Sequence, residues 1–508
     1  MGWKKGDVIV QVDPYAHVLG QKHRGTRCDS CFTCGKVLKK CTACMFLHYC
    51  SRTCQKNDWL LHKDECPCLK RVAPRIPTDS VRLLLRLLIR LQRGDNQKAV
   101  CDSANWRPFE ELETHSCEIL QDEKRSDLLA KATFTLRQMV GDSVSLPEAG
   151  DILDVFGRMV INTFSICDGE MQPIGSGVYL SPSLLDHSCV PNAVAVFTGT
   201  TLSVRCLTDI PGDQPTQVLI SYIDQLAPSC ERRKQLKEQY YFTCQCRRCT
   251  EADMDGLMLG AACQQRGCDG TLMYDGKTFL ACQTCQSRSS DEAYRLKVQT
   301  VMEESQTALK TLDHLKTSGD PETRLQVCKE LLRKQRVLSP FNVYYVKTLD
   351  QAMDVCIDSQ QWEQAVDFGQ QTVQPYVKLH PPGSPTVGIQ LLKLGKLQLY
   401  LHRLQAARMY LEQALSILRV THGTTMRSPL NTRPSWTVNS SLAEKNGASD
   451  SWLTLRCPTA FTTENISGLL SRVMELMYAL ESISDKYICF PGLYTTLMSY
   501  CRSRNIMD

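Results

Sequence analysis

The stretch YLSPSLLDHSCVPNA, residues 179–193, places a carboxylate, an imidazole and a thiol close together, at Asp186, His187 and Cys189. No other residue of the stretch carries a carboxylate, an imidazole or a thiol. A surface turn with an incidental cysteine is the simplest interpretation. The functional interpretation is a shared site, in which His187 faces a ligand and Cys189 faces a metal ion. The other cysteines of the chain help to decide between the two.

Cysteine is unusually frequent, with 27 among 508 residues. The N-terminal sequence MGWKKGDVIVQVD lacks the apolar region of a signal peptide, and no apolar run approaches the roughly 20 residues that span a bilayer. We therefore expect an intracellular protein, in the cytoplasm and nucleus, with no membrane contact. Disulfides are rare in such reducing compartments, so clustered cysteines indicate metal binding.

Positive charge is concentrated near the N-terminus of the chain. Residues 1–75 carry 14 Lys and Arg against 6 Asp and Glu, whereas the whole chain has a net charge of +5. Such a basic region suits an acidic partner, either nucleic acid or an acidic protein segment. A solvated basic face without a partner explains the charge equally well.

Residues 28–66 contain eight potential zinc ligands in four pairs. Two thiolates in a C-x2-C turn can reach one metal ion together. Two further pairs are spaced four residues apart, which we expect to place each pair on one face of a helix. Eight ligands predict two tetrahedral zinc sites. The ligands are Cys28, Cys31, Cys41, Cys44, Cys50, Cys54, His62 and Cys66.

Two further cysteine clusters lie in the second half of the chain. The segment YYFTCQCRRC supplies three thiolates and leaves one tetrahedral position open, for which Cys189 is the natural candidate. The predicted ligands of this site are Cys189, Cys244, Cys246 and Cys249. The segment CQQRGCDGTLMYDGKTFLACQTC resembles a zinc ribbon with short strands TLMY and TFLAC. Its ligands would be Cys263, Cys268, Cys282 and Cys285.

The first cluster resembles the MYND zinc finger over its full length. From residue 158 to 249, short β-branched strands (VAVF, TLSVRCL and QVLISYI) alternate with Gly and Pro turns. This part resembles a SET domain with a cysteine-rich post-SET tail. Together they identify roughly residues 6–422 as similar to the SET and MYND lysine methyltransferase family, most of all to its third member. The resemblance implies that Cys28, Cys31, Cys50 and Cys54 hold one zinc ion, and Cys41, Cys44, His62 and Cys66 the other.

The resemblance implies a protein-lysine N-methyltransferase that uses S-adenosylmethionine. Its substrates would be histone or non-histone proteins in transcription regulation or signalling. Tyr222 matches the active-site tyrosine, and Phe164 and Tyr240 match walls of the channel that admits the substrate lysine. The positions that match donor contacts are Asn162, Asp186, His187, Tyr222, Phe242, Glu113 and His115.

The residue types at these positions suit methyl transfer. The attacking lysine amine must be neutral, whereas a free lysine has a pKa of about 10.4. A dry aromatic channel beside a sulfonium cation disfavours the charged ammonium form. A tyrosine hydroxyl can then orient the amine and the methyl group, so positioning and electrostatics supply most of the rate effect.

Several positions depart from the family pattern. Asp186 and His115 stand where the family usually has Asn, and Arg107 stands where it has Tyr. A carboxylate accepts hydrogen bonds as an amide does but donates none. The family's Arg-Gly-x-Gly loop normally precedes a segment like the one that begins here at Gly6, and DIPGDQPTQ replaces a Gly-Glu-Glu-Leu stretch. We expect weaker donor binding, so the alternative function is a catalytically weak MYND adaptor. It would bind proline-rich peptides, the usual ligands of such fingers, or DNA.

The resemblance implies an α+β, multidomain fold. In it a β-rich SET fold is split by the finger and a helical insert, and is followed by a zinc-bound tail and a helical C-terminal domain. The expected parts are a truncated N-terminal SET segment (1–27), the MYND finger (28–66), a helical insert (67–157), the SET core (158–226), the post-SET zinc segment (227–250), a ribbon insert (251–290), a tetratricopeptide-like domain (291–423) and a divergent, partly disordered tail (424–508). We expect a monomer.

Four stretches predict particular helices. PTDSVRLLLRLLIRLQRG predicts a helix that begins at Thr78 or Asp79 and ends at Gly94, with leucines on one face and arginines on the other. Such a helix could lie on an anionic membrane, but packing on its own domain is far more common. QQWEQAVDFGQQTV and RLQAARMYLEQALSIL resemble tetratricopeptide hairpins, with a plain helical bundle as the alternative. ISGLLSRVMELMYALESI could form one more helix.

Overall fold

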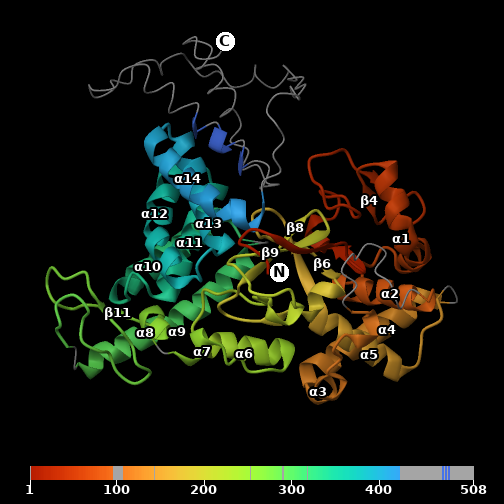
Figure 1. Cartoon of the computed structure of the whole chain (residues 1–508), viewed down its shortest axis with the longest axis horizontal. Helices are drawn as coiled ribbons and strands as arrows, with labels where there is room; N and C mark the ends of the chain where they lie inside the picture. Colours follow the sequence, from red (N-terminus) through yellow and green to blue (C-terminus); the bar gives the residue numbers. More distant parts are fainter. Residues whose placement is uncertain are drawn as a thin grey trace, which may run out of the picture.

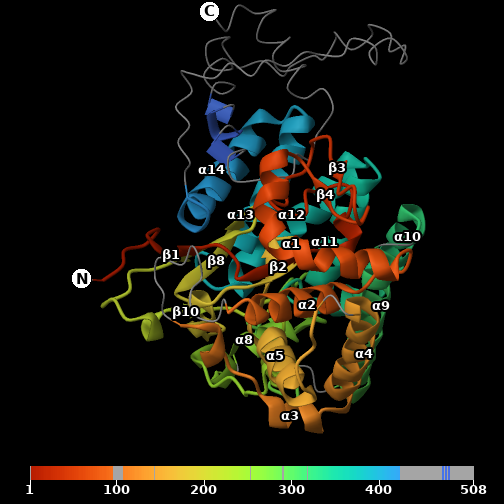
Figure 2. The same ribbon diagram turned by 90° about the vertical axis from the view of Figure 1, so that its right-hand side faces the viewer.

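The computed structural model describes residues 2–94, 107–141, 144–251, 253–288, 291–316 and 319–423, together with 472–473, 475–477 and 479–480. Strands occupy the centre, with the finger and the C-terminal helices on opposite sides of them (Figures 1 and 2). The mixed, multidomain fold class predicted from the sequence is confirmed. Most of the segment predicted to be disordered lies outside the described residues.

Two three-stranded antiparallel sheets form the central core. The first has the order β1 (Val8–Val12), β9 (Thr201–Cys206) and β8 (Ala193–Thr198). The second has the order β2 (Ala16–Leu19), β6 (Pro173–Val178) and β5 (Thr163–Cys167). Each sheet therefore pairs a strand from before the finger with strands from after the helical insert. The two inserted segments leave the pairing intact.

A short parallel pair joins the turn at residue 186 to the segment that carries Tyr222. β7 (Asp186–His187) pairs with β10 (Leu219–Ile220). The strand predicted for QVLISYI is thus shorter than expected, and Tyr222 follows its end. This pairing places the DHSC turn directly beside the tyrosine segment.

The finger consists of a small hairpin and one long helix. The hairpin pairs β3 (Lys39–Lys40) with β4 (His48–Tyr49), and α1 spans Arg52–Val72. The Ser51 side chain caps α1 by accepting a hydrogen bond from the Cys54 N–H. Cys50 precedes the helix, so the prediction that Cys50 and Cys54 share a helical face is wrong. A turn followed by a cap brings these two thiols together instead.

The predicted arginine-rich helix exists as α2 (Asp79–Gln92), capped by Thr78 and followed by Gly94 with a φ of +74°. It packs against α1 and β2 rather than lying free. Its two faces do not separate buried from exposed residues, because Arg82 and Arg86 are 3% and 0% exposed. Both guanidinium groups pair with carboxylates of α1. The helical insert continues with α3 (Ser116–Gln121), α4 (Glu123–Val140) and α5 (Ala149–Asn162).

The post-SET and ribbon segments connect the strands to the C-terminal helices. The post-SET segment contains α6 (Ser229–Tyr240) and α7 (Arg247–Thr250). The ribbon segment contains α8 (Asp253–Met258), β11 (Ala261–Ala262) and β12 (Thr271–Leu272). The strand expected in TLMY is therefore present as β12. TFLAC contributes only a bridge between Phe279 and Tyr274.

Antiparallel helices build the C-terminal domain. They are α9 (Glu292–Leu315), α10 (Pro321–Lys334), α11 (Val343–Asp358), α12 (Trp362–Leu379), α13 (Pro385–Tyr400) and α14 (Leu404–Thr421). Small residues permit close packing: a Cβ at Gly369 would lie 2.7 Å from the Met353 Sδ. The described residues of the predicted extra helix are helical, and Val473, Leu476 and Leu480 are buried in the same core. Within the described residues, no helix is both long and apolar enough to cross a bilayer.

Candidate functional site

The imidazole of His187 joins the tyrosine segment to a cysteine cluster. The backbone N–H of Tyr222 donates to His187 Nδ1 at 3.0 Å, and His187 Nε2 lies 3.2 Å from Cys189 Sγ. Because Nδ1 accepts, the ring proton belongs on Nε2 and faces the sulfur. Burial, together with the charge of Arg232, lowers the pKa of His187 to about 4, which keeps the ring neutral. The two ring nitrogens thus hold the turn together.

Aromatic rings surround Tyr222. Its ring centroid lies 5.0 Å from that of Tyr240, 5.2 Å from His187 and 6.5 Å from Phe242. All four rings are half-buried. Phe164, on β5, has its edge-to-face ring contact with Tyr179 instead, at 5.7 Å. The aromatic cluster of Tyr222, Tyr240, Phe242 and His187 thus presents several π-faces around one hydroxyl group.

The Tyr222 hydroxyl is fixed by the main chain. It donates to the carbonyl oxygen of Leu185 at 2.5 Å. Burial and the negative charge of Asp186 raise the pKa of Tyr222 above its ordinary value. The group therefore stays protonated at neutral pH and serves as an oriented O–H dipole. Asp186 itself is exposed on β7.

Residues predicted to contact the methyl donor are linked by hydrogen bonds from a side-chain amide to main-chain carbonyl oxygens. Asn162 Nδ2 donates to the carbonyl oxygens of Glu113 at 3.0 Å and Arg158 at 2.8 Å. The Glu113 side chain is exposed. His115 has a φ of +48°, and its Nδ1 lies 3.3 Å from Glu118 Oε1. Asn162 and Glu113 therefore meet, whereas the His115 ring faces its own helix and Tyr241.

Arg107 is a site residue that the sequence marked only as a departure from the family. Its Nη1 donates to the Ser183 carbonyl at 3.4 Å, next to the turn at Asp186. Its Nε is buried and has no hydrogen-bond partner in the described structure. Its charge acts on Tyr222, whose pKa it lowers against the larger effect of burial. An unpaired buried guanidinium N–H is costly unless a ligand accepts from it.

These features fit S-adenosylmethionine. The ligand carries a sulfonium cation, which aromatic faces attract, and a carboxylate, which a guanidinium N–H can bind. Phe242 and the other rings of the aromatic cluster would supply the faces, and Arg107 would supply the unpaired donor. Asn162 has both amide protons engaged, so only its oxygen remains for the ligand.

Eight predicted ligands of the finger gather into two groups of four. Within each group, the candidate ligand atoms lie within 4.8 Å of one another. Zinc–sulfur bonds of about 2.3 Å in a tetrahedron require sulfur atoms about 3.8 Å apart. Cys31–Cys50 and Cys41–Cys66 sulfurs are 3.7 and 3.9 Å apart. The groups are Cys28, Cys31, Cys50 and Cys54, and Cys41, Cys44, His62 and Cys66. The pairs interleave as expected.

The histidine of the second group is oriented for metal binding. His62 Nε2 lies 3.4 Å from Cys41 Sγ and 3.5 Å from Cys44 Sγ. Its other nitrogen, Nδ1, lies 3.2 Å from Glu65 Oε2. A carboxylate behind a ligating imidazole fixes the tautomer and the ring orientation. The donor set of this group therefore suits zinc.

Two more groups of four thiols have the same geometry. One unites Cys189 with Cys244, Cys246 and Cys249, and the Cys189 and Cys249 sulfurs lie 3.6 Å apart. The other consists of Cys263, Cys268, Cys282 and Cys285, with sulfur separations of 3.6 and 3.7 Å. Gly270 allows the close fold of this ribbon, because a Cβ there would meet the Cys282 sulfur at 2.3 Å. Arg232 places a cation beside the first of these groups, with Nη2 3.5 Å from Cys249 Sγ.

We expect four zinc ions per chain in metal analysis by mass spectrometry, because four groups have the tetrahedral spacing. Replacing Cys189 with serine should remove one ion and loosen the turn that holds His187. Replacing the exposed Cys117, which belongs to none of the groups, should leave the metal content unchanged. Two or fewer ions in the unmodified chain would contradict the assignment.

Comparisons with known proteins agree with this geometry. The family model described as the MYND finger matches residues 28–66. The histone-lysine N-methyltransferase SMYD3 of Homo sapiens is 36% identical over 423 residues, 83% of this chain and 89% of that protein. ASHR1 of Arabidopsis thaliana, also named a histone-lysine N-methyltransferase, is 32% identical, covering 83% and 88% of the two chains. The N-lysine methyltransferase SMYD2 of Homo sapiens is 31% identical, covering 82% and 90%.

The matches with these relatives each span more than four-fifths of the chain. The match to the MYND finger and the spacing of the cysteine groups are the evidence for zinc binding. The chain therefore belongs to the SET and MYND domain-containing lysine methyltransferase family.

Proposed function

We propose that this protein transfers a methyl group from S-adenosylmethionine to the side-chain amine of a lysine in a protein substrate. The observation that carries the proposal is the position of Tyr222. Its backbone N–H donates a hydrogen bond to His187, and its hydroxyl donates one to the Leu185 carbonyl. Its ring packs against that of Tyr240. One tyrosine is thus fixed at three points, between the DHSC turn and the post-SET segment.

The roles of the surrounding residues follow from their chemistry. Phe242 and His187 offer ring faces to the donor, while Arg107 and the Asn162 oxygen supply polar contacts. Tyr240 and Phe164 border the path of the substrate lysine in this proposal. S-adenosylmethionine supplies an electrophilic methyl carbon. The aromatic surroundings favour the neutral amine, and the Tyr222 hydroxyl orients the groups that react.

The direct test is methyl transfer from isotope-labelled S-adenosylmethionine to purified histones and to non-histone proteins. Donor binding is measured separately by calorimetry on the same zinc-loaded chain. The proposal expects both donor binding and label in lysine. Donor binding without label would point to an untested substrate, whereas no binding of the donor would favour the adaptor function.

A docking role for the finger is supported by its exposed apolar side chains. Val37 is 87% exposed, Met45 57%, Trp59 45% and Leu60 70%. Apolar side chains that stay in water within so small a domain are candidates for a partner surface. We propose that the finger binds an extended proline-rich peptide, as its family resemblance implies. DNA is a weaker partner, attracted by the exposed Lys36, Lys39 and Lys40.

Salt should separate the two finger ligands. DNA binding by the full chain should fall steeply as salt rises, because counterions are released from the phosphates. Binding of a proline-rich peptide should change little, because apolar contacts carry it. Leu60→Ser should weaken the peptide selectively, and Lys36→Gln with Lys39→Gln should weaken the DNA. Fluorescence anisotropy measures both, and earlier loss of the peptide would reverse the ranking.

We place the protein in the cytoplasm and nucleus and propose that it acts as a monomer. The thiols support this location, because every described cysteine is free and the zinc ligands must stay reduced. Sedimentation of the zinc-loaded chain tests the monomer, and imaging of the tagged chain in cells tests the location.

A further inference from the structure

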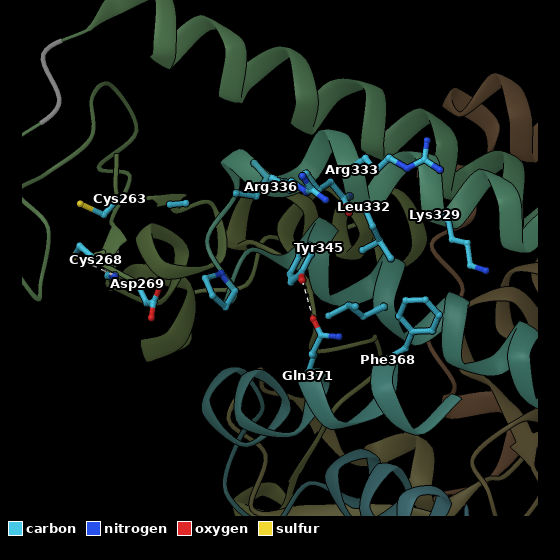
Figure 3. A pocket seen from close by; sticks show the side chains of 16 residues that line it. Cys263, Cys268, Asp269, Lys329, Leu332, Arg333, Arg336, Tyr345, Phe368 and Gln371 are labelled. Carbon is cyan, nitrogen blue, oxygen red and sulfur yellow. Dashed lines mark hydrogen bonds between the residues drawn. The ribbon is translucent and has the colours of Figure 1, made fainter. Parts of the chain in front are cut away.

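A cavity of about 740 Å³ lies between the ribbon segment and the helices α10 to α12. We call it the ribbon groove. Figure 3 shows Arg333, Leu332 and Lys329 along one side, and Cys263, Cys268 and Asp269 at the ribbon end. None of the residues assigned to methyl transfer lines it. The groove is therefore a separate feature of the molecule.

The ribbon wall of the groove is held firmly against the helices. The Tyr294 hydroxyl donates to the Ala262 carbonyl at 2.8 Å and lies 3.1 Å from the Val337 carbonyl. Asn342 Nδ2 donates to the Gly260 carbonyl at 3.0 Å. Leu272 and Phe279 of the ribbon are buried in a small core with α9. These contacts give the groove a preformed shape.

One wall carries three cations at helical spacing. Lys329, Arg333 and Arg336 lie at i, i+4 and i+7, which places them on one side of α10 and its extension. Within the described residues, none of the three has an ion-pair or hydrogen-bond partner. Their neighbour Lys334, which does not line the groove, pairs with Glu304 at 2.7 Å. The three cations without a partner thus line the cavity.

The floor combines apolar surface with one unsatisfied acceptor. Leu349 and Phe368 line it, and the Tyr345 hydroxyl donates to Gln371 Oε1 at 3.0 Å across the floor (Figure 3). Gln335 also lines the groove and is fully buried. Its Nε2 donates to the Tyr344 carbonyl at 3.2 Å, and its Oε1 has no partner in the described structure.

We propose that the ribbon groove binds an acidic peptide segment of a partner protein, in which apolar side chains alternate with carboxylates. The carboxylates pair with Lys329, Arg333 and Arg336. The apolar side chains cover the floor, where Leu349 and Phe368 lie. Nucleic acid fits less well, because its backbone carries a phosphate at every nucleotide, also beside the carboxylate of Asp269, whereas the peptide can place an apolar side chain there.

The test is fluorescence anisotropy on the full zinc-loaded chain, without a methyl donor, so its outcome does not depend on the proposed methyl transfer. Three labelled probes are compared. The first is a peptide of alternating glutamate with leucine and phenylalanine, the second has serine in place of every apolar residue, and the third is a short single-stranded DNA. We expect the first probe to bind about 10-fold more tightly than either of the others, since a buried apolar anchor adds at least that factor.

The double variant Arg333→Glu with Arg336→Glu should weaken the first probe by about 10-fold or more, because both charge-assisted contacts become repulsive. Both side chains are exposed, so the fold should persist. The matched control is Lys297→Glu with Lys310→Glu, an equal charge change at exposed positions of α9 outside the groove. Equal binding of all three probes, or an equal loss in the control variant, would overturn the proposal. Tightest binding of the DNA would assign the groove to nucleic acid instead.

Discussion

Replacing Tyr222 with phenylalanine is expected to lower kcat for methyl transfer by about 100-fold or more, the usual effect of deleting a hydrogen-bonding group aimed at the reacting atoms. The affinity for S-adenosylmethionine should stay within about twofold, since the ring remains to pack on its neighbours. The variant keeps the bond from the residue 222 N–H to His187 and the contact with Tyr240. Only the hydroxyl and its bond to the Leu185 carbonyl are lost.

Tyr241→Phe is the matched control for this prediction. The Tyr241 hydroxyl donates to Asp122 Oδ2 at 3.3 Å and takes no part in the aromatic cluster around Tyr222. Its loss should leave kcat and donor affinity unchanged. Zinc content and the melting temperature verify that both variants fold. If Tyr222→Phe kept more than a third of the activity, or lost donor binding together with activity, the hydroxyl would have no selective role in the reaction.

The metal sites could be predicted from the sequence because their ligands lie close together along the chain. Pairs such as Cys41 and Cys44 fit one metal ion by local geometry alone. The distant ligand Cys189 is indicated by the sequence because three neighbouring thiolates leave one tetrahedral position open. The structure brings Cys189 to Cys249, with 3.6 Å between their sulfurs. The number of ligands that zinc requires thus predicts a contact between two segments that are far apart in the sequence.

Side-chain directions were harder to predict, because they depend on contacts between distant segments. The sequence placed His187 at the site but gave no sign that its ring would bridge the Tyr222 N–H and the Cys189 sulfur. Arg107 appeared only as an unusual residue, and its unpaired Nε is visible only once its neighbours are in place. Likewise, the ribbon groove forms between segments whose sequence patterns do not indicate that they lie side by side.

The secondary structure was predictable where the hydrophobic residues of a segment follow a single period, that of a strand or that of a helix. Alternating burial in β9 and the capped apolar helix α2 both follow from local patterns. The same pattern failed for the arginines of α2, because a helix with charged residues on one face normally exposes them. Here carboxylates from α1 cover that face, and no local signal in α2 announces them. The burial of Arg86 has a large energetic consequence.

Arg86 lies at the centre of a buried ionic cluster that joins the finger to the central strands. Its Nε and Nη2 donate to Glu65 Oε2 at 3.0 and 2.7 Å, and its Nη1 pairs with Asp58 Oδ1 at 3.1 Å. The same Nη1 donates to the carbonyl of His17, on β2, at 2.9 Å. Glu65 in turn holds the zinc-binding His62. A single guanidinium thus connects a predicted metal ligand to a strand of the SET core.

Arg86→Met is expected to destabilise the zinc-loaded chain by about 3–5 kcal/mol, because it leaves buried carboxylates without their cation. Burial alone would raise the pKa of Glu65, but Arg82 and Arg86 hold it well below its usual range, so the carboxylate remains charged. Arg82 Nε, 3.0 Å from Glu65, can compensate for only part of this charge, and it does not replace the bond to Asp58. Denaturant unfolding followed by circular dichroism measures the loss.

The connection between the metal site and the strand gives this variant a second, local readout. Once Glu65 is less well fixed, His62 should release its zinc ion faster to a chromophoric chelator, while the ribbon zinc is released at the unmodified rate. Lys131→Met, which removes an exposed pair with Asp127, should change stability by no more than about 0.5 kcal/mol. A loss of stability in Arg86→Met without faster zinc release would mean that the cluster supports packing only. Unchanged stability would show that the buried carboxylates find other partners, and the finger would then be joined to the strands mainly by the apolar packing of α2.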